Sequence, residues 1–414
     1  MMFAEYKNDS LYIEKVAFAD IARQFGTPCY VYSRAALLES AREFMEAFPD
    51  ALLCYAVKAN GNLAVLETFA KLGCGFDIVS GGELARVIAA GGTPSKIVYS
   101  GVGKTAEEIE CALNAGILCF NVESFSELDL IAAVAEKLKL MAPVSFRVNP
   151  DVDPKTHPYI STGLKENKFG IPIEACLDAY RRAAALPYIR VIGIDMHIGS
   201  QLTAIAPFAD AVQKLLPVID ALNREGISLH HIDLGGGIGV TYRDETVPPL
   251  KEWAAAAQRI LGNRAERLIV EPGRRMVARA GFLLSRVIHL KPGSPHQFAI
   301  VDAAMNDLMR PALYEAWHPV LPVVQHHDVP KTHWNIVGPV CETADFLAKD
   351  RALSLKQNDW IAVGVAGAYG SSMSSNYNAR PRAAEVMVDG DRAYLIRKRE
   401  TIESLFANET GLIL

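Results

Sequence analysis

Lys58 is the residue of this chain best suited to covalent chemistry. It follows the apolar run Ala51–Val57, which is typical of a buried parallel strand, and Gly61 breaks the pattern three residues later. A lysine amine at the end of such a strand can bond covalently to an aldehyde. A single lysine after a strand is more often an exposed loop charge, so the residues that accompany it decide between these two interpretations.

Three groups with complementary chemistry follow later apolar runs. The backbone N–H groups of Gly235–Gly237 can enclose an oxyanion such as a phosphate, although a flexible turn fits the same pattern. Glu271 can keep a pyridine nitrogen protonated, or it can form an ion pair with Arg274 that closes a turn. His197 can stack on a planar ring while Ser200 binds a phosphate, whereas a lone histidine at a strand end is more often structural.

A lysine amine, an anion-binding glycine run, a carboxylate and a ring-stacking imidazole together indicate a pyridoxal phosphate site. The later part of the chain adds two groups that suit an amino-acid substrate. Arg310 carries a guanidinium that can hold a carboxylate by two hydrogen bonds. Cys341 keeps a proton at neutral pH that it can deliver, or it is a small buried side chain like the other cysteines.

Eight short apolar runs alternate with segments of helical period, and the candidate groups lie at the ends of these runs. This alternation predicts a (β/α)8 barrel, whose chemistry collects where the strands end. An open doubly wound sheet fits the periodicity alone, but eight units without a GxGxxG motif after the first strand favour the barrel. The predicted strands are 51–57, 75–80, 96–101, 119–124, 144–150, 191–199, 229–235 and 268–273. Among the helices, the segment that begins at Thr105 has a capping-box spacing to Glu108.

The pattern changes near Gly281, where short strand-like runs separated by turn residues replace the long helices. We therefore expect a second domain, a mostly antiparallel β-barrel or sandwich. An N-terminal helix over 16–25 and a strand over 29–32 are expected to pack with it. The predicted division is 32–280 for the cofactor-binding barrel, with 1–31 and 281–414 forming the β-rich domain.

Composition restricts the partners and the compartment. The 414 residues are 50% hydrophobic and carry a formal net charge of −5 without a basic block, which argues against nucleic acid or anionic membrane as a partner. No apolar stretch approaches the ~20 residues that span a bilayer, and no signal peptide is recognisable. The seven cysteines are odd in number and show no C-x-x-C pair, so we expect reduced thiols in a cytoplasm and no metal site.

The order and spread of the motifs resemble the fold-type III pyridoxal-phosphate-dependent decarboxylases, over about residues 27–388. Any one of the motifs is a weak signal, and their combination is a strong one. The motifs that carry the resemblance are Tyr55–Asn60, His197–Gln201, Gly235–Gly237, Glu271–Arg274, Cys341-Glu342 and Gly367–Gly370.

This resemblance implies roles for the matching positions. Lys58 would bind the cofactor covalently, His197 would stack on its ring, Glu271 would pair with the ring nitrogen and Cys341 would return a proton to the substrate carbon. The other cofactor-binding residues would be Asp77, Ser200, Gly236, Gly237, Gly273, Arg274 and Tyr369. The substrate-binding residues would be Arg274, Arg310, Tyr314, Glu342 and Tyr369.

The resemblance is strongest to the branch that converts meso-2,6-diaminopimelate to L-lysine and CO2. That substrate has a second amino-acid head, whose ammonium suits Glu342 and whose carboxylate suits an arginine. Related decarboxylases that produce amines have Asp where this chain has Glu342, which suits a substrate with no distal carboxylate. In this family the Cys-Glu segment reaches into the barrel of a second subunit, which implies a homodimer with shared active sites.

Three alternatives stay open at this point. The first is a decarboxylase of another basic amino acid, such as ornithine, D-lysine or arginine. The second is an alanine racemase, which shares a pyridoxal barrel but has arginine near the ring nitrogen where this chain has Glu271. The third is a non-catalytic pyridoxal-binding regulator, a class that tends to lose the lysine or the acid, whereas Lys58 and Cys341 are both present.

Overall fold

The computed structural model describes residues 3–153, 162–163 and 167–412. The chain divides into two compact units. The barrel unit comprises Glu39–Thr241 and Glu245–Met276, and the sheet unit comprises Met1–Leu38, Tyr242–Asp244 and Val277–Leu414.

Eight parallel strands form the closed ring of the barrel unit, as the alternation predicts. They run in the order β9-β11-β12-β13-β5-β6-β7-β8, and pairing of β8 with β9 closes the ring. The strands are β5 (Leu52–Ala56), β6 (Gly75–Ile78), β7 (Ile97–Tyr99), β8 (Cys119–Val122), β9 (Ala142–Asn149), β11 (Ile189–Asp195), β12 (His231–Asp233) and β13 (Arg267–Val270), with the short β10 (Ile171–Pro172) paired to β9. Because all eight are parallel, their carboxyl ends lie on one rim.

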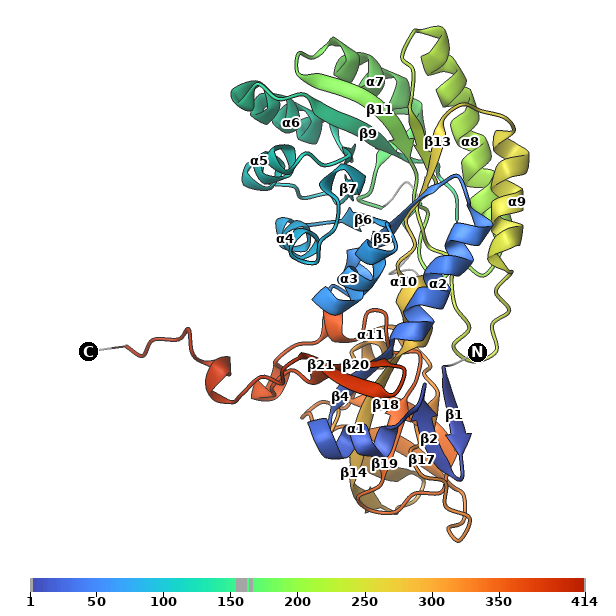
Figure 1. Ribbon diagram of the computed structural model, residues 1–414, viewed down its shortest axis with the longest axis vertical. Helices are drawn as coiled ribbons and strands as arrows, with labels where there is room; N and C mark the ends of the chain where they lie inside the picture. Colours follow the sequence, from blue (N-terminus) through green and yellow to red (C-terminus); the bar gives the residue numbers. More distant parts are fainter. Residues whose placement is uncertain (1–2, 154–161, 164–166, 413–414) are drawn as a thin grey trace. The chain divides into compact units, whose positions relative to one another are not determined.

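Helices follow the strands and surround the ring (Figure 1). The predicted capping box is confirmed: Glu108 N–H donates to Thr105 Oγ1 (3.2 Å) and Thr105 N–H donates to Glu108 Oε2 (3.0 Å). The helices of this part of the chain are α2 (Arg34–Ala47), α3 (Leu63–Lys71), α4 (Gly81–Ala89), α5 (Ala106–Ala115), α6 (Phe125–Leu138), α7 (Cys176–Ala185), α8 (Ile205–Arg224), α9 (Leu250–Leu261) and α10 (Arg274–Val277).

The sheet unit contains a nine-stranded sheet and a small three-stranded one. Most pairings are antiparallel, as predicted, and the exceptions are β15 with β17 and β20 with β4, which are parallel. The large sheet comprises β4 (Cys29–Ser33), β14 (Gly281–Lys291), β15 (Gln297–Val301), β16 (Val320–Pro322), β17 (Thr332–Val337), β18 (Phe346–Leu353), β19 (Trp360–Val363), β20 (Ala384–Asp389) and β21 (Arg392–Arg397); the small one comprises β1 (Ala4–Lys7), β2 (Ser10–Ile13) and β3 (Val16–Ala17).

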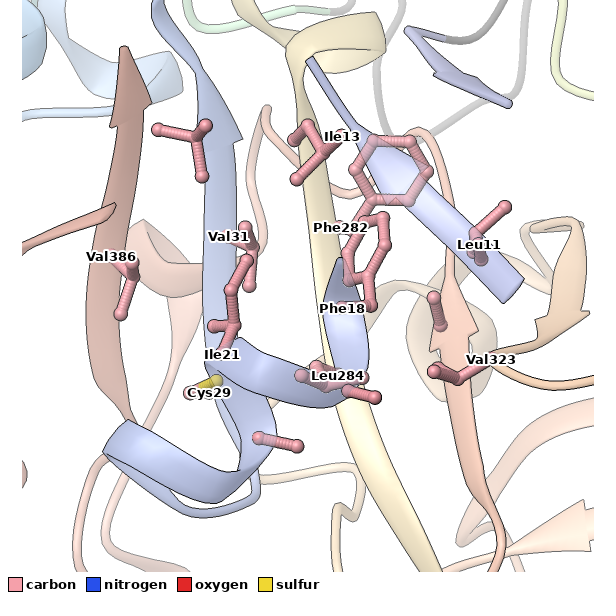
Figure 2. Close-up of a cluster of buried hydrophobic side chains, with 14 of the residues drawn as sticks. Leu11, Ile13, Phe18, Ile21, Cys29, Val31, Phe282, Leu284, Val323 and Val386 are labelled. Atoms are coloured by element: carbon pink, nitrogen blue, oxygen red, sulfur yellow. The ribbon is translucent and has the colours of Figure 1, made fainter. Parts of the chain in front are cut away.

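The N-terminal helix is shorter than the period of its sequence predicts. Helix α1 (Phe18–Phe25) begins after Ala17, because Val16 and Ala17 pair with β2 as the strand β3 and so have an extended backbone. Its apolar face packs into a buried cluster that joins β2, β14 and β20 (Figure 2). There the rings of Phe18 and Phe282 meet edge to face at 5.2 Å. Each such buried side chain contributes about 1.5–3 kcal/mol.

Inside the barrel, a histidine ring fills the space beside a glycine. His231 on β12 is buried and lies opposite Gly193 on β11 in the parallel register. A Cβ on Gly193 would overlap the imidazole ring. The glycine is therefore required by packing, since its φ lies outside the left-handed region.

We expect Gly193→Ala to lower the free energy of unfolding by about 1–3 kcal/mol, because the added methyl group overpacks the barrel interior. Gly103→Ala is the matched control: a Cβ there meets nothing within 4 Å, so the change should stay within about 0.5 kcal/mol. Urea unfolding of both variants measures this. Equal midpoints for the two variants would contradict the packing role of His231.

Candidate active site

Lys58 follows β5 directly, in the single 3-10 turn Val57–Ala59. Its Nζ lies 3.0 Å from Oδ2 of Asp77, which β6 holds beside it because Ala56 and Asp77 are register partners. The carboxylate is 1% exposed, whereas the Lys58 side chain is 39% exposed. This places the Lys58 amine at the rim, beside a buried carboxylate and partly exposed to solvent.

The glycine run lies against the ends of two other strands. Gly235 and Gly237 have φ values of 64° and 95°, which other residues rarely adopt. A Cβ on Gly236 would overlap the carbonyl oxygen of Glu271, and one on Gly237 would overlap that of Gly199. The run therefore requires glycine for close backbone approach as well as for its conformation.

His197 follows β11, and its ring is fixed by this glycine loop. Gly236 N–H donates to His197 Nδ1 at 3.2 Å, so Nδ1 carries no proton and Nε2 carries it. Burial, together with the cations of Arg147 and Lys58, holds the pKa of His197 well below its ordinary value. Arg147 also donates to the backbone carbonyl of His197 at 3.2 Å. The ring is therefore a neutral imidazole in a fixed orientation.

Three buried carboxyl groups meet at neighbouring strand ends. Oxygen atoms of Asp195, Asp233 and Glu271 all lie within 4.8 Å of one another. Burial is the main cause that raises their pKa values, and repulsion from neighbouring carboxylates adds to it; the pKa of Asp233 rises to about 7. The cluster therefore holds protons that separate, solvated carboxyl groups would release, and it favours a cation or an N–H donor beside it.

Glu271 has two polar neighbours, the side chain of Asn121 and the backbone of Gly235. Asn121 on β8 donates to Glu271 Oε1 at 3.5 Å and to Ser100 Oγ at 3.2 Å. The backbone N–H of Glu271 donates to the carbonyl of Gly235 at 2.8 Å. Asn121 thus contacts the carboxyl group, and the backbone of Glu271 is joined to the glycine run.

Arg274 begins α10, directly after Gly273, and is buried. Its Nη2 donates to Ser200 Oγ at 3.1 Å. A guanidinium and a hydroxyl form a donor set that suits a phosphate, whereas in the glycine run the N–H groups of Gly235 and Gly236 already donate to Asp233 and His197.

Within the sheet unit, Arg310 is buried at the start of α11 (Arg310–Tyr314). Its Nη1 lies 2.9 Å from His318 Nε2, and His318 Nδ1 lies 2.9 Å from the carbonyl of Gly364. The carbonyl requires a proton on Nδ1, so Nε2 is the acceptor for the guanidinium. The guanidinium also lies over the ring of Tyr242, 4.6 Å from its centre.

The segment with Cys341 and Glu342 is exposed, and a buried aspartate anchors its base. Asp345 accepts the N–H of Met305 at 2.7 Å and that of Val340 at 2.8 Å. These two bonds join the segment to the stretch that leads to Arg310.

Tyr369 lies in a strained part of the same unit. Its φ is 55°, in the left-handed region that few non-glycine residues adopt. Gly367 and Gly370 flank it, and a Cβ on either would overlap backbone carbonyl oxygens. Such strain persists where surrounding structure enforces it and is common at binding sites.

The structure thus gathers the predicted residues into two sets. The barrel unit holds Lys58, Asp77, His197, Ser200, Gly236, Gly237, Glu271, Gly273 and Arg274, and the sheet unit holds Arg310, Tyr314, Cys341, Glu342 and Tyr369. Sequence reasoning missed Asp195 and Asp233 as site residues, although an aspartate inside an apolar strand was an available signal. It also missed His318 and Asp345, which have no comparable local signal.

No described helix is both long and apolar enough to cross a membrane. All seven cysteines are free thiols.

Comparison with known proteins gives concordant results. The family described as "Pyridoxal-dependent decarboxylase, pyridoxal binding domain" matches residues 34–278. The chain is 56% identical to a diaminopimelate decarboxylase of Neisseria meningitidis serogroup B, over 98% of each chain. It is 55% identical to that of Vibrio cholerae, over 100% of each chain. The crystal structure of the M. jannaschii diaminopimelate decarboxylase in complex with L-lysine is similar with a TM-score of 0.94 and 40% identity, covering 99% of this chain and 98% of that one.

The carboxyl cluster predicts an unusual pH dependence of stability in protein prepared without cofactor. The folded state keeps a proton on Asp233 up to about pH 7, whereas the unfolded chain releases it near pH 4. Stability should therefore fall as the pH rises between these values, by up to about 1.4 kcal/mol per pH unit for each proton.

Asp233→Asn should flatten this dependence, because the amide cannot ionise and its oxygen can still accept the N–H of Gly235. Thermal unfolding between pH 5 and 8 measures the effect. Asp178→Asn on the surface of α7 is the control and should keep the wild-type slope. Equal slopes for all three proteins would show that the cluster does not hold the proton.

Proposed function

We propose a function from one premise: the chain belongs to the diaminopimelate decarboxylase family of pyridoxal-dependent decarboxylases. The protein removes CO2 from meso-2,6-diaminopimelate and yields L-lysine, the last step of bacterial lysine biosynthesis. Its cofactor is pyridoxal 5′-phosphate. The observation that carries the proposal is the group formed by Lys58, Asp77 and the buried carboxyl cluster at the ends of the barrel strands.

The residues at this rim fit the cofactor. Buried acceptor atoms are available there, because Oδ1 of Asp77 and Oδ1 of Asp195 have no hydrogen-bond partner among the described residues. Lys58 supplies the amine that holds the cofactor, and Asp77 keeps that amine at the rim. When bound, the cofactor withdraws the electron pair left on the substrate carbon after CO2 departs.

Glu271 holds the proton on which this electron withdrawal depends. Its raised pKa favours sharing a proton with a ring nitrogen, and a positively charged ring relieves the repulsion among the three carboxyl groups. His197 packs against the ring as a neutral imidazole, so it adds no charge that would oppose the protonated nitrogen. Glu271 and His197 therefore both favour the protonated form of the ring nitrogen.

The remaining candidate residues are assigned to the phosphate and to the substrate. Gly236, Gly237, Gly273, Ser200, Arg274 and Tyr369 surround the phosphate. Arg274, Arg310, Tyr314, Glu342 and Tyr369 bind the substrate, with a guanidinium for the distal carboxylate and Glu342 for the distal ammonium. Cys341 delivers the proton that replaces CO2.

Three further features belong to this proposal. The chain forms a homodimer in which the Cys341 segment of one subunit completes the site of the other. Residues 32–280 form the cofactor-binding module, and 1–31 with 281–414 form the module that supplies substrate-binding residues. The enzyme works in a reducing cytoplasm, which the seven free thiols support.

The first test is CO2 release by the purified protein with meso-diaminopimelate, ornithine, arginine and both enantiomers of lysine in parallel. We expect release from diaminopimelate alone, with L-lysine as the product. Release only from another amino acid would keep the cofactor site and overturn the assignment of Glu342 and Arg310.

Cys341→Ala should lower kcat by about 10²–10³-fold, because the proton must then come from water. The absorption of the bound cofactor should be unchanged, since Lys58 and Glu271 are intact. Cys111→Ala is the control, because Cys111 is also an exposed thiol but lies on α5, and it should leave kcat unaltered. Wild-type turnover in Cys341→Ala would assign the acid to a different residue.

A further inference from the structure

We propose that Tyr377 and Asn378 are positioning residues that clamp Glu342 and Cys341, and that the clamp gives the site its selectivity for a distal ammonium group. This inference rests on the proposed function, because it takes Glu342 as the residue that binds that ammonium. It assigns roles to two residues outside every motif that the sequence singles out.

Two hydrogen bonds form the clamp, one from Tyr377 to Glu342 and one from Cys341 to Asn378. The hydroxyl of Tyr377 donates to Oε1 of Glu342 at 2.6 Å. The backbone N–H of Cys341 donates to Oδ1 of Asn378 at 2.9 Å. Adjacent residues of one segment thus hold adjacent residues of the other, so the acid and the specificity residue are fixed together.

The backbone of the clamp is shaped for this contact. Asn378 has φ 56° and ψ 30°, and the next residue, Ala379, also has a positive φ. Asparagine tolerates the left-handed region better than most residues, which explains its presence at this position. The turn aims the Asn378 amide oxygen at the N–H of Cys341.

A buried residue holds the base of the clamp. Ser375 N–H donates to the carbonyl of Asn306 at 2.9 Å, and Arg380 Nε donates to the Asn306 side chain at 2.9 Å. Asn306 is 1% exposed and precedes Arg310 by four residues. The clamp, the acid segment anchored by Asp345 and the segment that leads to Arg310 therefore share one framework.

The chemistry of the phenol matters for the role of Glu342. Glu342 is exposed, so without a partner its side chain would sample several rotamers, and ordering it on binding would cost free energy. A lysine or arginine partner would orient the carboxylate but would also neutralise it. Tyr377 orients it with a neutral donor, and this hydrogen bond raises the pKa of the phenol, which keeps its proton. The full negative charge remains available to an ammonium group.

Tyr377→Phe in the full-length holoenzyme tests the first half of the clamp. We expect KM for meso-diaminopimelate to rise by about tenfold with kcat within about threefold of wild type, because Cys341 is still held by Asn378. The absorption of the bound cofactor should not change. Tyr394→Phe is the control and should alter nothing, since Tyr394 is exposed to a similar degree, 47% against 44%, on β21 of the same unit.

Binding of two product-like ligands, measured by calorimetry, separates positioning from general damage. L-lysine keeps the distal ammonium, whereas 6-aminohexanoate is the same chain without it. Tyr377→Phe should weaken L-lysine by about tenfold and leave 6-aminohexanoate unchanged. Equal weakening of both ligands, or of neither, would overturn the role of Tyr377.

Variants of Asn378 test the other half of the clamp, the contact with Cys341. They should change kcat and not affinity, the reverse of the pattern expected for Tyr377→Phe. Asn378→Gly keeps the left-handed turn but removes the acceptor for Cys341 N–H, so kcat should fall about tenfold while L-lysine affinity changes little. Asn378→Asp retains an acceptor oxygen and should restore most of kcat. Failure of this rescue, or an unchanged kcat in Asn378→Gly, would overturn the positioning of Cys341.

Failure of the clamp is distinguishable from failure of the proposed function. If wild type decarboxylates only another diamino acid, the proposed function fails. The selectivity role of Tyr377 then fails as well, because the assignment of Glu342 is overturned, whereas the positioning of Cys341 is still tested by kcat of Asn378→Gly with that amino acid.

Discussion

Closure of a parallel ring is the constraint on which the site depends. Pairing of β13 with β5 and of β8 with β9 brings eight carboxyl ends onto one rim. Backbone bonds continue past the strands, from Ala56 N–H to the carbonyl of Pro272 and from Glu271 N–H to that of Gly235. Residues more than 200 positions apart in the chain are thereby held within hydrogen-bonding distance, with little freedom to separate.

Closure of the ring brings three carboxyl groups close together at the rim, where their ionised forms repel one another. Asp195, Asp233 and Glu271 are buried together, which raises their pKa values. In the proposed site, a cofactor whose ring nitrogen takes up a proton would relieve that repulsion, so binding and electron withdrawal would share one driving force. The neutral, hydrogen-bonded His197 suits the proposed site, because a cation at its position would oppose a protonated ring.

The sheet unit uses a different principle, in which neutral donors and backbone contacts orient charged groups. Asp345 is satisfied by two backbone N–H groups, Arg310 by the neutral His318, and Glu342 by the phenol of Tyr377. None of these contacts joins a charged side chain to one of opposite charge. A neutral partner orients a charged group without adding an opposing charge, which suits recognition of a zwitterionic head in the proposed site.

The sequence by itself determined the barrel and the second β domain, because strand periodicity is a local pattern. It also predicted the candidate site residues, because the glycine run and the groups after each strand are local patterns too. Val16 and Ala17 departed from the predicted helix because pairing with β2 outweighs helical period. Only the tertiary structure decided that Asp195 and Asp233 join Glu271, that His318 holds Arg310, and that Tyr377 meets Glu342. The carboxyl cluster and the Tyr377–Glu342 contact join separate segments of the chain, and the periodicity of one segment carries no information about which other segment it will meet. His318 lies only eight residues after Arg310, but their contact forms across the end of α11, where helical period no longer applies.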